Sequence, residues 1–182
     1  KGYKLVLVMP DSMSLERRAM LLAFGCEVVL SPGDKGTGGA IKLALHVAKE
    51  RGGIILNQFD NEDNVMVHEV TTGPEIWEDT EGKVDIFVSG VGTGGTVMGV
   101  SKFLKSKNPN VKVVAVEPQE SPVLGGGKPG PHKIAGIGAG FVPGNIEMSG
   151  IDEILTVSSD DAVAMGKRLV AEEALMGGIS SG

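Results

Sequence analysis

An apolar strand followed at once by a glycine loop constrains the fold of this chain more than any other feature. Residues 84–89 read Val-Asp-Ile-Phe-Val-Ser, and residues 90–96 read Gly-Val-Gly-Thr-Gly-Gly-Thr. Glycines let the backbone take dihedral angles that other residues avoid, and they let it approach an anion closely. A helix that begins after such a loop directs its free N–H groups and its positive dipole end at the same point. The segment therefore predicts a strand–loop–helix unit that holds a phosphate group.

Short apolar strands and helical segments alternate along nearly the whole chain. Strands are predicted at 4–9, 27–30, 54–56, 84–89, 111–117 and 154–157, and helices at 15–24, 39–50, 64–79, from the glycine loop to 107, and 160–175. We expect Gly73-Pro74 to kink or split the helix over 64–79. The alternation predicts an α/β fold with mostly parallel, twisted sheets and helices on both faces. The long irregular segment 118–150 is the kind of loop that usually carries function.

Composition excludes several classes of partner. The chain has 182 residues, a net charge of -6 and no block of Lys or Arg, which argues against nucleic acid or an anionic membrane surface. No apolar run approaches the roughly 20 residues that span a bilayer. The single cysteine, Cys26, excludes an internal disulfide framework and fits a reducing compartment. We therefore expect a cytoplasmic protein, or an organellar one in a eukaryote. Because the chain starts in a strand and stops in a loop, we also expect it to be an interior portion of a longer protein.

The glycine loop has a second interpretation. Gly90, Gly92 and Gly95 match the dinucleotide-binding fingerprint, and Glu117 ends the next strand, where that fingerprint places its ribose-binding acid. The fingerprint usually opens its domain, whereas at least three predicted βα units precede it here. The glycines could also do no more than allow a tight turn. On the loop alone, a nicotinamide-dependent oxidoreductase stays an open alternative.

Several other segments point to a different phosphate ligand. They are Met9 to Arg18, Asn-Gln-Phe at 57–59, Thr-Gly-Pro-Glu-Ile-Trp at 72–77, Val-Glu-Pro at 116–118, Gly-Pro-His-Lys-Ile at 130–134, Gly-Ile-Gly-Ala-Gly-Phe at 136–141, and Gly-Ile-Ser-Ser-Gly at 178–182. Together with the glycine loop they resemble the cysteine synthases (O-acetylserine sulfhydrylases), which are fold-type II pyridoxal phosphate (PLP) enzymes. The resemblance covers essentially the whole chain in order. The stretch 130–141 favours this family over cystathionine β-synthase, threonine synthase and serine racemase.

The resemblance implies roles for particular residues. The PLP phosphate would be bound by Gly92, Thr93, Gly94, Gly95 and Thr96. Backbone N–H groups, hydroxyls and a helix N-terminus can supply donors to a phosphate without a basic side chain, which suits an acidic chain. Ser180, or alternatively Ser181, would hydrogen-bond the pyridine nitrogen, although the two serines could instead be a helix N-cap pair. The substrate would be contacted by Gln58, Gly136, Ile137 and Gly138, with the glycines permitting the loop to close. On sequence alone, Gln58 could equally be a buried amide at a strand end.

The resemblance also implies two lobes and a missing nucleophile. Residues 1–59 would be the remainder of a small N-terminal lobe, and residues 60–182 would be a larger PLP-binding lobe that is incomplete at its C-terminus. The family's Schiff-base lysine lies in a motif N-terminal to the stretch present here, so we expect it before Lys1 and assign no catalytic residue in this chain. No metal site is expected, because His46, His68 and His132 show no paired ligand spacing.

The implied activity is a β-replacement that makes L-cysteine from O-acetyl-L-serine and sulfide. The implied partners are a second copy of the chain in a homodimer and the C-terminal tail of serine acetyltransferase. Besides the oxidoreductase, a non-catalytic paralogue or fragment that lacks the lysine and binds a partner remains an alternative.

Overall fold

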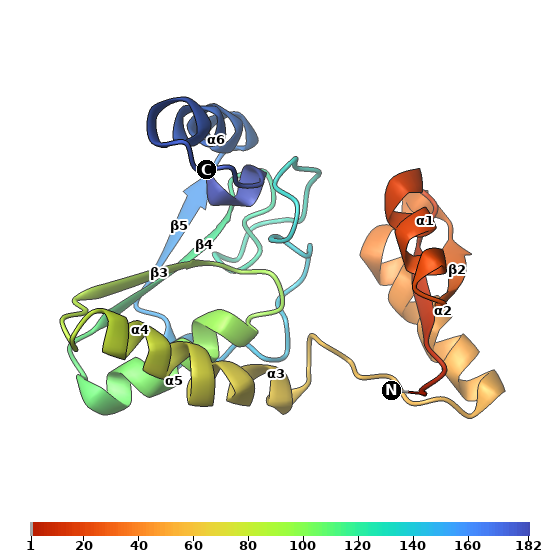
Figure 1. The fold of residues 1–182 in the computed structure, drawn as a ribbon, viewed down its shortest axis with the longest axis horizontal. Helices are drawn as coiled ribbons and strands as arrows, with labels where there is room; N and C mark the ends of the chain where they lie inside the picture. The colour runs from red at the N-terminus through yellow and green to blue at the C-terminus, as the bar shows by residue number, and fades with distance from the viewer. Residues whose placement is uncertain (1) are drawn as a thin grey trace. The chain divides into compact units, whose positions relative to one another are not determined.

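The computed structural model describes residues 2–182, which form two compact units that divide between Leu56 and Asn57 (Figure 1). This division falls a few residues before the predicted boundary between 59 and 60. Parallel strands alternate with helices in both units, which confirms the predicted α/β class. None of the helices formed by residues 2–182 combines the length and the apolar character needed to cross a membrane.

The first unit is built on a two-stranded parallel sheet of β1 (Val6–Pro10) and β2 (Glu27–Ser31). Helix α1 (Leu15–Ala23) joins the strands, and α2 (Gly36–Arg51) follows a 3-10 turn at Gly33–Lys35 and packs against β1. The Ser14 hydroxyl accepts a hydrogen bond from the Arg17 N–H at 3.3 Å and so caps the N-terminus of α1. The strand predicted at 54–56 is wrong: these residues belong to none of the strands formed by residues 2–182, and Ile54 is 94% exposed.

The second unit contains a three-stranded parallel sheet in the order β3 (Ile86–Gly90), β4 (Lys112–Pro118), β5 (Glu153–Val157). Helix α5 (Gly95–Lys107) joins β3 to β4, and α6 (Ser159–Glu173) follows β5. Between β4 and β5 the chain is irregular except for a 3-10 turn at Met148–Gly150, and a last 3-10 turn spans Ile179–Ser181. Because the strands are parallel, the glycine loop after β3 and the irregular segment after β4 leave the same edge of the sheet.

The helical run before β3 passes through a π-helical turn. Helix α3 (Glu62–Val67), the π turn His68–Thr72 and α4 (Gly73–Asp79) follow one another without a gap. The Gly73 N–H donates to the His68 carbonyl, five residues earlier, which is the wider hydrogen-bond spacing of a π-helix. Pro74 then lies in the first turn of α4, where its missing N–H is tolerated. The chain thus remains helical at the point where a kink or a split was expected.

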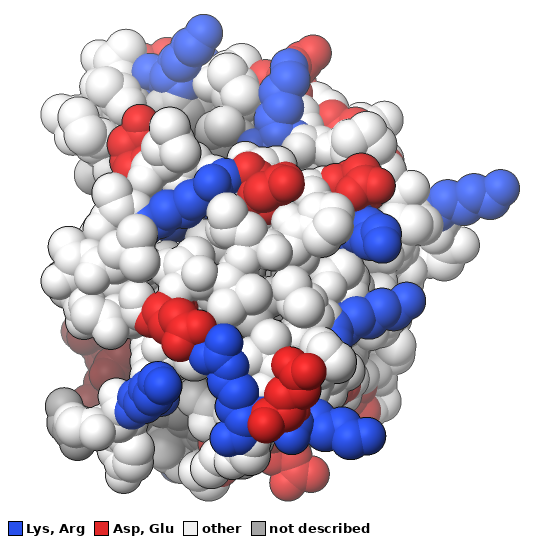
Figure 2. Space-filling model, turned by 90° about the vertical axis from the view of Figure 1, so that its right-hand side faces the viewer, with Lys and Arg blue, Asp and Glu red and all other residues white. Residues whose placement is uncertain are grey.

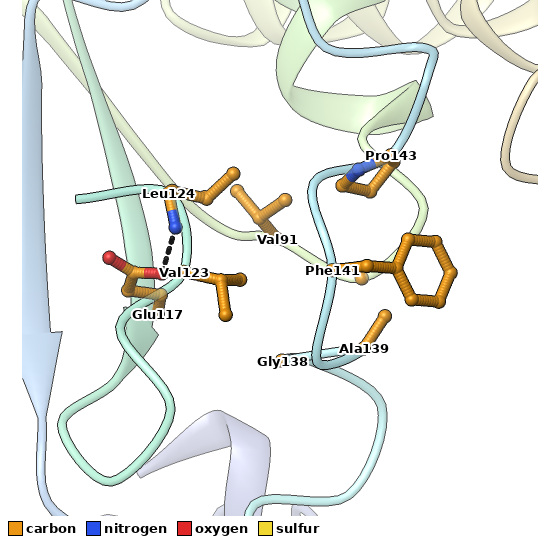
Figure 3. A pocket seen from close by; sticks show the side chains of 9 residues that line it. Val91, Glu117, Val123, Leu124, Gly138, Ala139, Phe141 and Pro143 are labelled. Atoms are coloured by element: carbon orange, nitrogen blue, oxygen red, sulfur yellow. Dashed lines mark hydrogen bonds between the residues drawn. The ribbon is translucent and has the colours of Figure 1, made fainter. Parts of the chain in front are cut away.

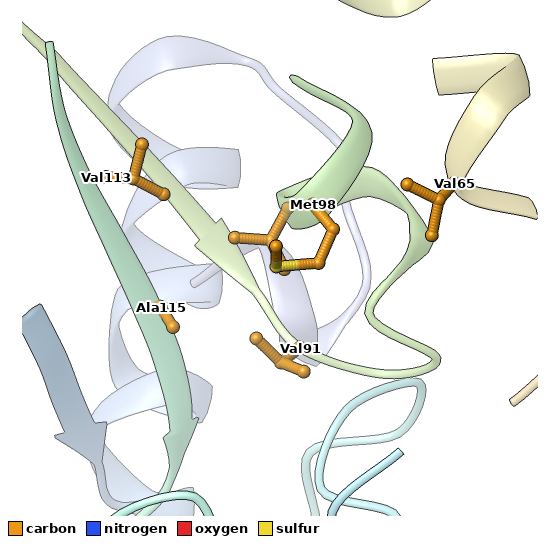
Figure 4. Packing of buried hydrophobic residues seen from close by; sticks show 6 residues of the cluster. Val65, Val91, Met98, Val113 and Ala115 are labelled. Carbon is orange, nitrogen blue, oxygen red and sulfur yellow. The ribbon is translucent and has the colours of Figure 1, made fainter. Parts of the chain in front are cut away.

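The hydrophobic core of the second unit lies between α5 and one face of the sheet (Figure 4). Met98 of α5 is 1% exposed and packs among Val91, Val113 and Ala115, with Val65 of α3 on its other side. On the opposite face of the sheet, Ile86, Val88 and Leu155 are exposed. Burial of the α5 side chains holds this helix firmly on the sheet. Its N-terminus is therefore fixed beside the end of β3.

Charged side chains of both signs are mixed on the face shown in Figure 2. Lys and Arg side chains lie near Asp and Glu side chains there, and uncharged surface lies between these charged groups. This face has none of the one-sided basic character that nucleic-acid-binding surfaces show.

Candidate functional site

The N-terminus of α5 opens onto a hollow. The helix begins at Gly95, and its N-cap, Gly94, has a left-handed backbone with φ of +86°. Gly94 has no side chain with which to cap the first-turn N–H groups, and Gly95 N lies 3.4 Å from Thr93 Oγ1, a long contact. A hollow of about 230 Å³ lies at this end of the helix; its lining consists of Gly90, Gly92, Thr93, Gly94, Thr96, Val97 and Gly136. The donors available there are backbone N–H groups and threonine hydroxyls, which suit an anion.

The segment 136–138 lies directly against the glycine loop. The Gly138 N–H donates to the Val91 carbonyl at 3.0 Å. A Cβ at Gly92 would overlap the Gly136 carbonyl oxygen, so this approach of two backbones is open only to glycine. A Cβ at Gly90 would lie 3.0 Å from the Ile137 side chain. The structure therefore brings the residues predicted for substrate, Gly136 to Gly138, beside those predicted for the cofactor phosphate.

Two asparagine side chains hold Gln58 near the glycine loop. Asn64 Nδ2 donates to the Gln58 carbonyl at 2.8 Å and to Thr93 Oγ1 at 3.0 Å. Asn145 Nδ2 donates to the same Gln58 carbonyl at 2.8 Å and to the Thr93 carbonyl at 3.1 Å. The Gln58 residue itself is exposed, which excludes the alternative of a buried amide at a strand end. Its backbone carbonyl is therefore held by two donors, while the residue as a whole is exposed.

Sequence reasoning missed both asparagines. Their partners are 6 and 29 residues away for Asn64, and 87 and 52 residues away for Asn145. No local spacing pattern can signal hydrogen bonds over such separations. An aromatic pair adds to the same junction, because the rings of Phe59 and Phe141 meet edge-on with centroids 5.0 Å apart.

A histidine contacts the first turn of α5. His68 Nε2 lies 3.2 Å from Thr96 Oγ1, and His68 Nδ1 lies 2.8 Å from Thr72 Oγ1. Sequence analysis considered His68 only as a metal ligand. The structure instead connects it to one of the threonines predicted to bind phosphate.

Glu117 is occupied by the backbone that follows β4. The residue is 1% exposed, and one carboxylate oxygen accepts a hydrogen bond from Leu124 N at 2.7 Å (Figure 3). The other carboxylate oxygen accepts from Gly125 N at 2.9 Å. Beside it lies a cavity of about 10 Å³ that Val91, Leu124 and Phe141 help to line. Both oxygens are used within the chain, so Glu117 does not serve as the free ribose-binding acid of a dinucleotide site. The dinucleotide interpretation of the loop loses its acidic residue.

The segment leading to 136–138 is tied to the start of α6. His132 Nε2 lies 2.9 Å from the Gly138 carbonyl. Ser159 Oγ accepts from Lys133 N at 2.9 Å, and the Ser159 N–H donates to Glu120 Oε1 at 2.8 Å. The hydrogen bond from the Ser159 backbone lowers the pKa of the Glu120 carboxyl. The loop is therefore held by several hydrogen bonds at its N-terminal end.

The contacts of the described residues add nothing to two other predictions, the role of Ser180 and the location of the Schiff-base lysine before Lys1. Ser180 lies exposed in the last 3-10 turn, and none of the contacts described for residues 2–182 links it to the glycine loop. None of the lysines among residues 2–182 lines the hollow, and Lys83 and Lys133 instead pair with Glu81 at 2.6 Å and Asp160 at 3.1 Å. Among the described residues, no group of three or more His, Cys, Asp or Glu side chains could hold a metal ion.

The protein is thus a parallel α/β protein whose β3–α5 turn presents N–H groups and threonine hydroxyls to a hollow, an arrangement that suits an anion. The model of the pyridoxal-phosphate dependent enzyme family matches residues 1–182, and the chain belongs to that family.

Within this family, the relatives and solved structures that the chain resembles include cysteine synthases. Over 183 residues the chain is 55% identical to cysteine synthase 3 of Caenorhabditis elegans, covering 100% of this chain and 54% of the relative. It is 51% identical over 183 residues to a cysteine synthase of Staphylococcus aureus, covering 100% and 59% respectively. The crystal structure of a cysteine synthase from Entamoeba histolytica superposes with a TM-score of 0.94 at 47% identity, over 99% of this chain and 54% of that one. The fold is that of the fold-type II PLP enzymes, and the chain spans between half and two thirds of the length of these relatives.

Proposed function

We propose that this chain forms part of a PLP-dependent cysteine synthase, which makes L-cysteine from O-acetyl-L-serine and sulfide by β-replacement. The observation that carries the proposal is the glycine-capped N-terminus of α5, which opens onto a hollow of about 230 Å³. We assign this hollow to the cofactor phosphate. The first-turn N–H groups and the hydroxyls of Thr93 and Thr96 would donate to it, and hydrogen bonds to a charged acceptor are about twice as strong as neutral ones.

The neighbouring segments have roles that follow from their placement. Gln58 has an exposed side chain on an anchored backbone, so its amide N–H can donate to the carboxylate of an amino-acid substrate. Gly136 to Gly138 would cover the substrate side of the cofactor, because they lie against the glycine loop. The role of Ser180 rests on the family resemblance and not on its placement: it would meet the pyridine nitrogen. A neutral hydroxyl there leaves the ring a weaker electron sink than a carboxylate would.

Bound PLP supplies the electron sink for loss of the substrate's α-proton and its acetate group. What the described residues contribute is binding, orientation and coverage. No residue of this chain is assigned as the amine that carries the cofactor. A homodimer and binding of a serine acetyltransferase tail rest on the family resemblance, and a cytoplasmic location rests on the composition of the chain; all three remain predictions.

The test compares two cofactor forms that differ only in the phosphate. Apo-protein is titrated with PLP and with pyridoxal, with binding followed by absorbance or fluorescence, and cysteine formation from O-acetylserine and sulfide is assayed in parallel. We expect PLP to bind much more tightly than pyridoxal, and cysteine to form. Equal affinity for the two would refute the phosphate assignment, and a dissociation constant for NAD below that for PLP would favour the oxidoreductase. Phosphate-dependent binding without cysteine formation would favour the non-catalytic alternative.

A further inference from the structure

A series of hydrogen-bonded side chains connects the hollow at the N-terminus of α5 with the π-helical turn. Thr72 Oγ1 lies 2.8 Å from His68 Nδ1, and His68 Nε2 lies 3.2 Å from Thr96 Oγ1. Thr96 also lines the hollow. The histidine thus joins a threonine outside the site to a threonine inside it.

Two features of the backbone place His68 there. The π turn His68–Thr72 is closed by the Gly73 N–H bonding to the His68 carbonyl, so the helix is widened at this residue. On the facing helix, a Cβ at position 99 would lie 2.7 Å from the His68 Cβ. Gly99 stands one turn after Thr96 on the same side of α5, and its missing side chain lets His68 approach the first turn of the helix. Both features accompany the approach of His68 Nε2 to within 3.2 Å of Thr96 Oγ1.

The direction of the hydrogen bond between His68 and Thr96 decides whether Thr96 can donate to an anion, because a hydroxyl has only one proton. If Thr96 donates to the histidine, it has no donor left for an anion in the hollow. If the histidine donates from Nε2, the Thr96 oxygen is satisfied as an acceptor and its proton is free to point at the anion. In a neutral imidazole the second arrangement requires Nδ1 to be an acceptor, and the Thr72 hydroxyl can donate to it.

We propose that His68 is a positioning residue for phosphate binding: it accepts a hydrogen bond from Thr72, donates one to Thr96, and thereby directs the Thr96 hydroxyl proton at the cofactor phosphate. This inference rests on the proposed function, because it needs an anion in the hollow. It assigns a role to a residue that does not itself line the hollow.

Substitutions separate positioning from packing. His68→Phe keeps a ring against Gly99 and removes both nitrogens, and we expect it to weaken PLP binding about tenfold, the size of one oriented hydrogen bond to a charged group. His68→Gln keeps an amide donor at a reach similar to that of Nε2, and should restore most of the affinity. Thr71→Val is the matched control, because the Thr71 hydroxyl bonds to the Val67 carbonyl and not to the histidine. It should leave PLP affinity unchanged.

The decisive comparison uses Thr96→Val as a background. If His68 acts through Thr96, His68→Phe will cause no further loss of PLP affinity once the Thr96 hydroxyl is gone. Affinity for pyridoxal, which lacks the phosphate, should be the same in all of these variants. Losses that add in the double variant, or an equal loss of PLP and pyridoxal affinity in His68→Phe, would overturn the inference. If wild-type protein binds PLP and pyridoxal equally, the phosphate assignment is overturned as well. If wild-type protein prefers PLP but His68→Phe leaves PLP affinity unchanged, only the inference about His68 is overturned.

A measurement on unaltered protein covers the case in which a variant does not fold. Long-range proton–nitrogen NMR of the imidazole reports which ring nitrogen carries the proton. We expect the Nε2–H tautomer of His68 in the PLP-bound protein. The Nδ1–H tautomer would contradict the proposal, because His68 would then accept from Thr96.

Discussion

Replacement of Gly94 by alanine tests whether the loop geometry at the start of α5 is needed for stability and for phosphate binding. Gly94 has φ of +86°, and holding an L-residue in the left-handed region costs about 1–2 kcal/mol. The new Cβ would also lie 2.6 Å from Ile146 Cδ1, well inside the 3.5–4.0 Å at which carbon atoms pack. Relieving that overlap should cost a further ~1–3 kcal/mol. The sum predicts a loss of about 2–5 kcal/mol in the free energy of unfolding, and a weaker affinity for PLP because the first-turn N–H groups shift.

The matched control is Gly126→Ala. Gly126 has nearly the same backbone, with φ of +85°, but a Cβ there meets nothing within 4 Å, and the residue does not line the hollow. It should lose only the conformational part, about 1–2 kcal/mol, and keep wild-type PLP affinity. Urea unfolding gives the stabilities, and PLP and pyridoxal titrations give the affinities. The reasoning is refuted if the two variants lose equal stability, or if Gly94→Ala binds PLP as tightly as wild type does.

Three further predictions concern side chains of the second unit that hydrogen-bond to its backbone. Glu117→Gln places an amide N–H₂ against one of the backbone donors, such as Leu124 N, and should cost about 2–4 kcal/mol in urea unfolding; a loss under about 0.5 kcal/mol would contradict the role of the carboxylate. Asn145→Ala removes donors from two backbone carbonyls and should cost about 1–3 kcal/mol, with faster amide exchange over 57–60, whereas unchanged exchange would refute it. The hydrogen bond from Lys105 lowers the pKa of the Asp152 carboxyl below its usual 3.8, so this carboxyl stabilises the fold above that pH and loses its effect as the pH falls through the lowered pKa. Asp152→Asn should therefore unfold at less urea than wild type at pH 7 and at similar urea near pH 2, and a pH-independent difference would contradict this.

Local patterns predicted the elements that position the site. The strand at β3 and the helix over Gly95–Lys107 could both be predicted, because each depends on residues within a turn or a strand of one another. The run at 54–56 was misjudged because an apolar segment becomes a strand only where a neighbouring strand pairs with it.

The site likewise has features that local sequence predicts and contacts that only the tertiary structure decides. The prediction that the glycine loop binds a phosphate could be made from its own residues, since backbone freedom and helix polarity are local properties. The grip of Asn64 and Asn145 on Gln58, the engagement of Glu117 by the loop after β4, and the approach of His68 to Thr96 were decided only by the tertiary structure. These pairs are distant in sequence or depend on how a loop turns back, and they meet because the parallel register of β3 and β4 and the packing of α5 on the sheet bring their segments to one edge. A local pattern specifies a conformation, whereas a hydrogen bond across the fold depends on where every element between its partners comes to rest.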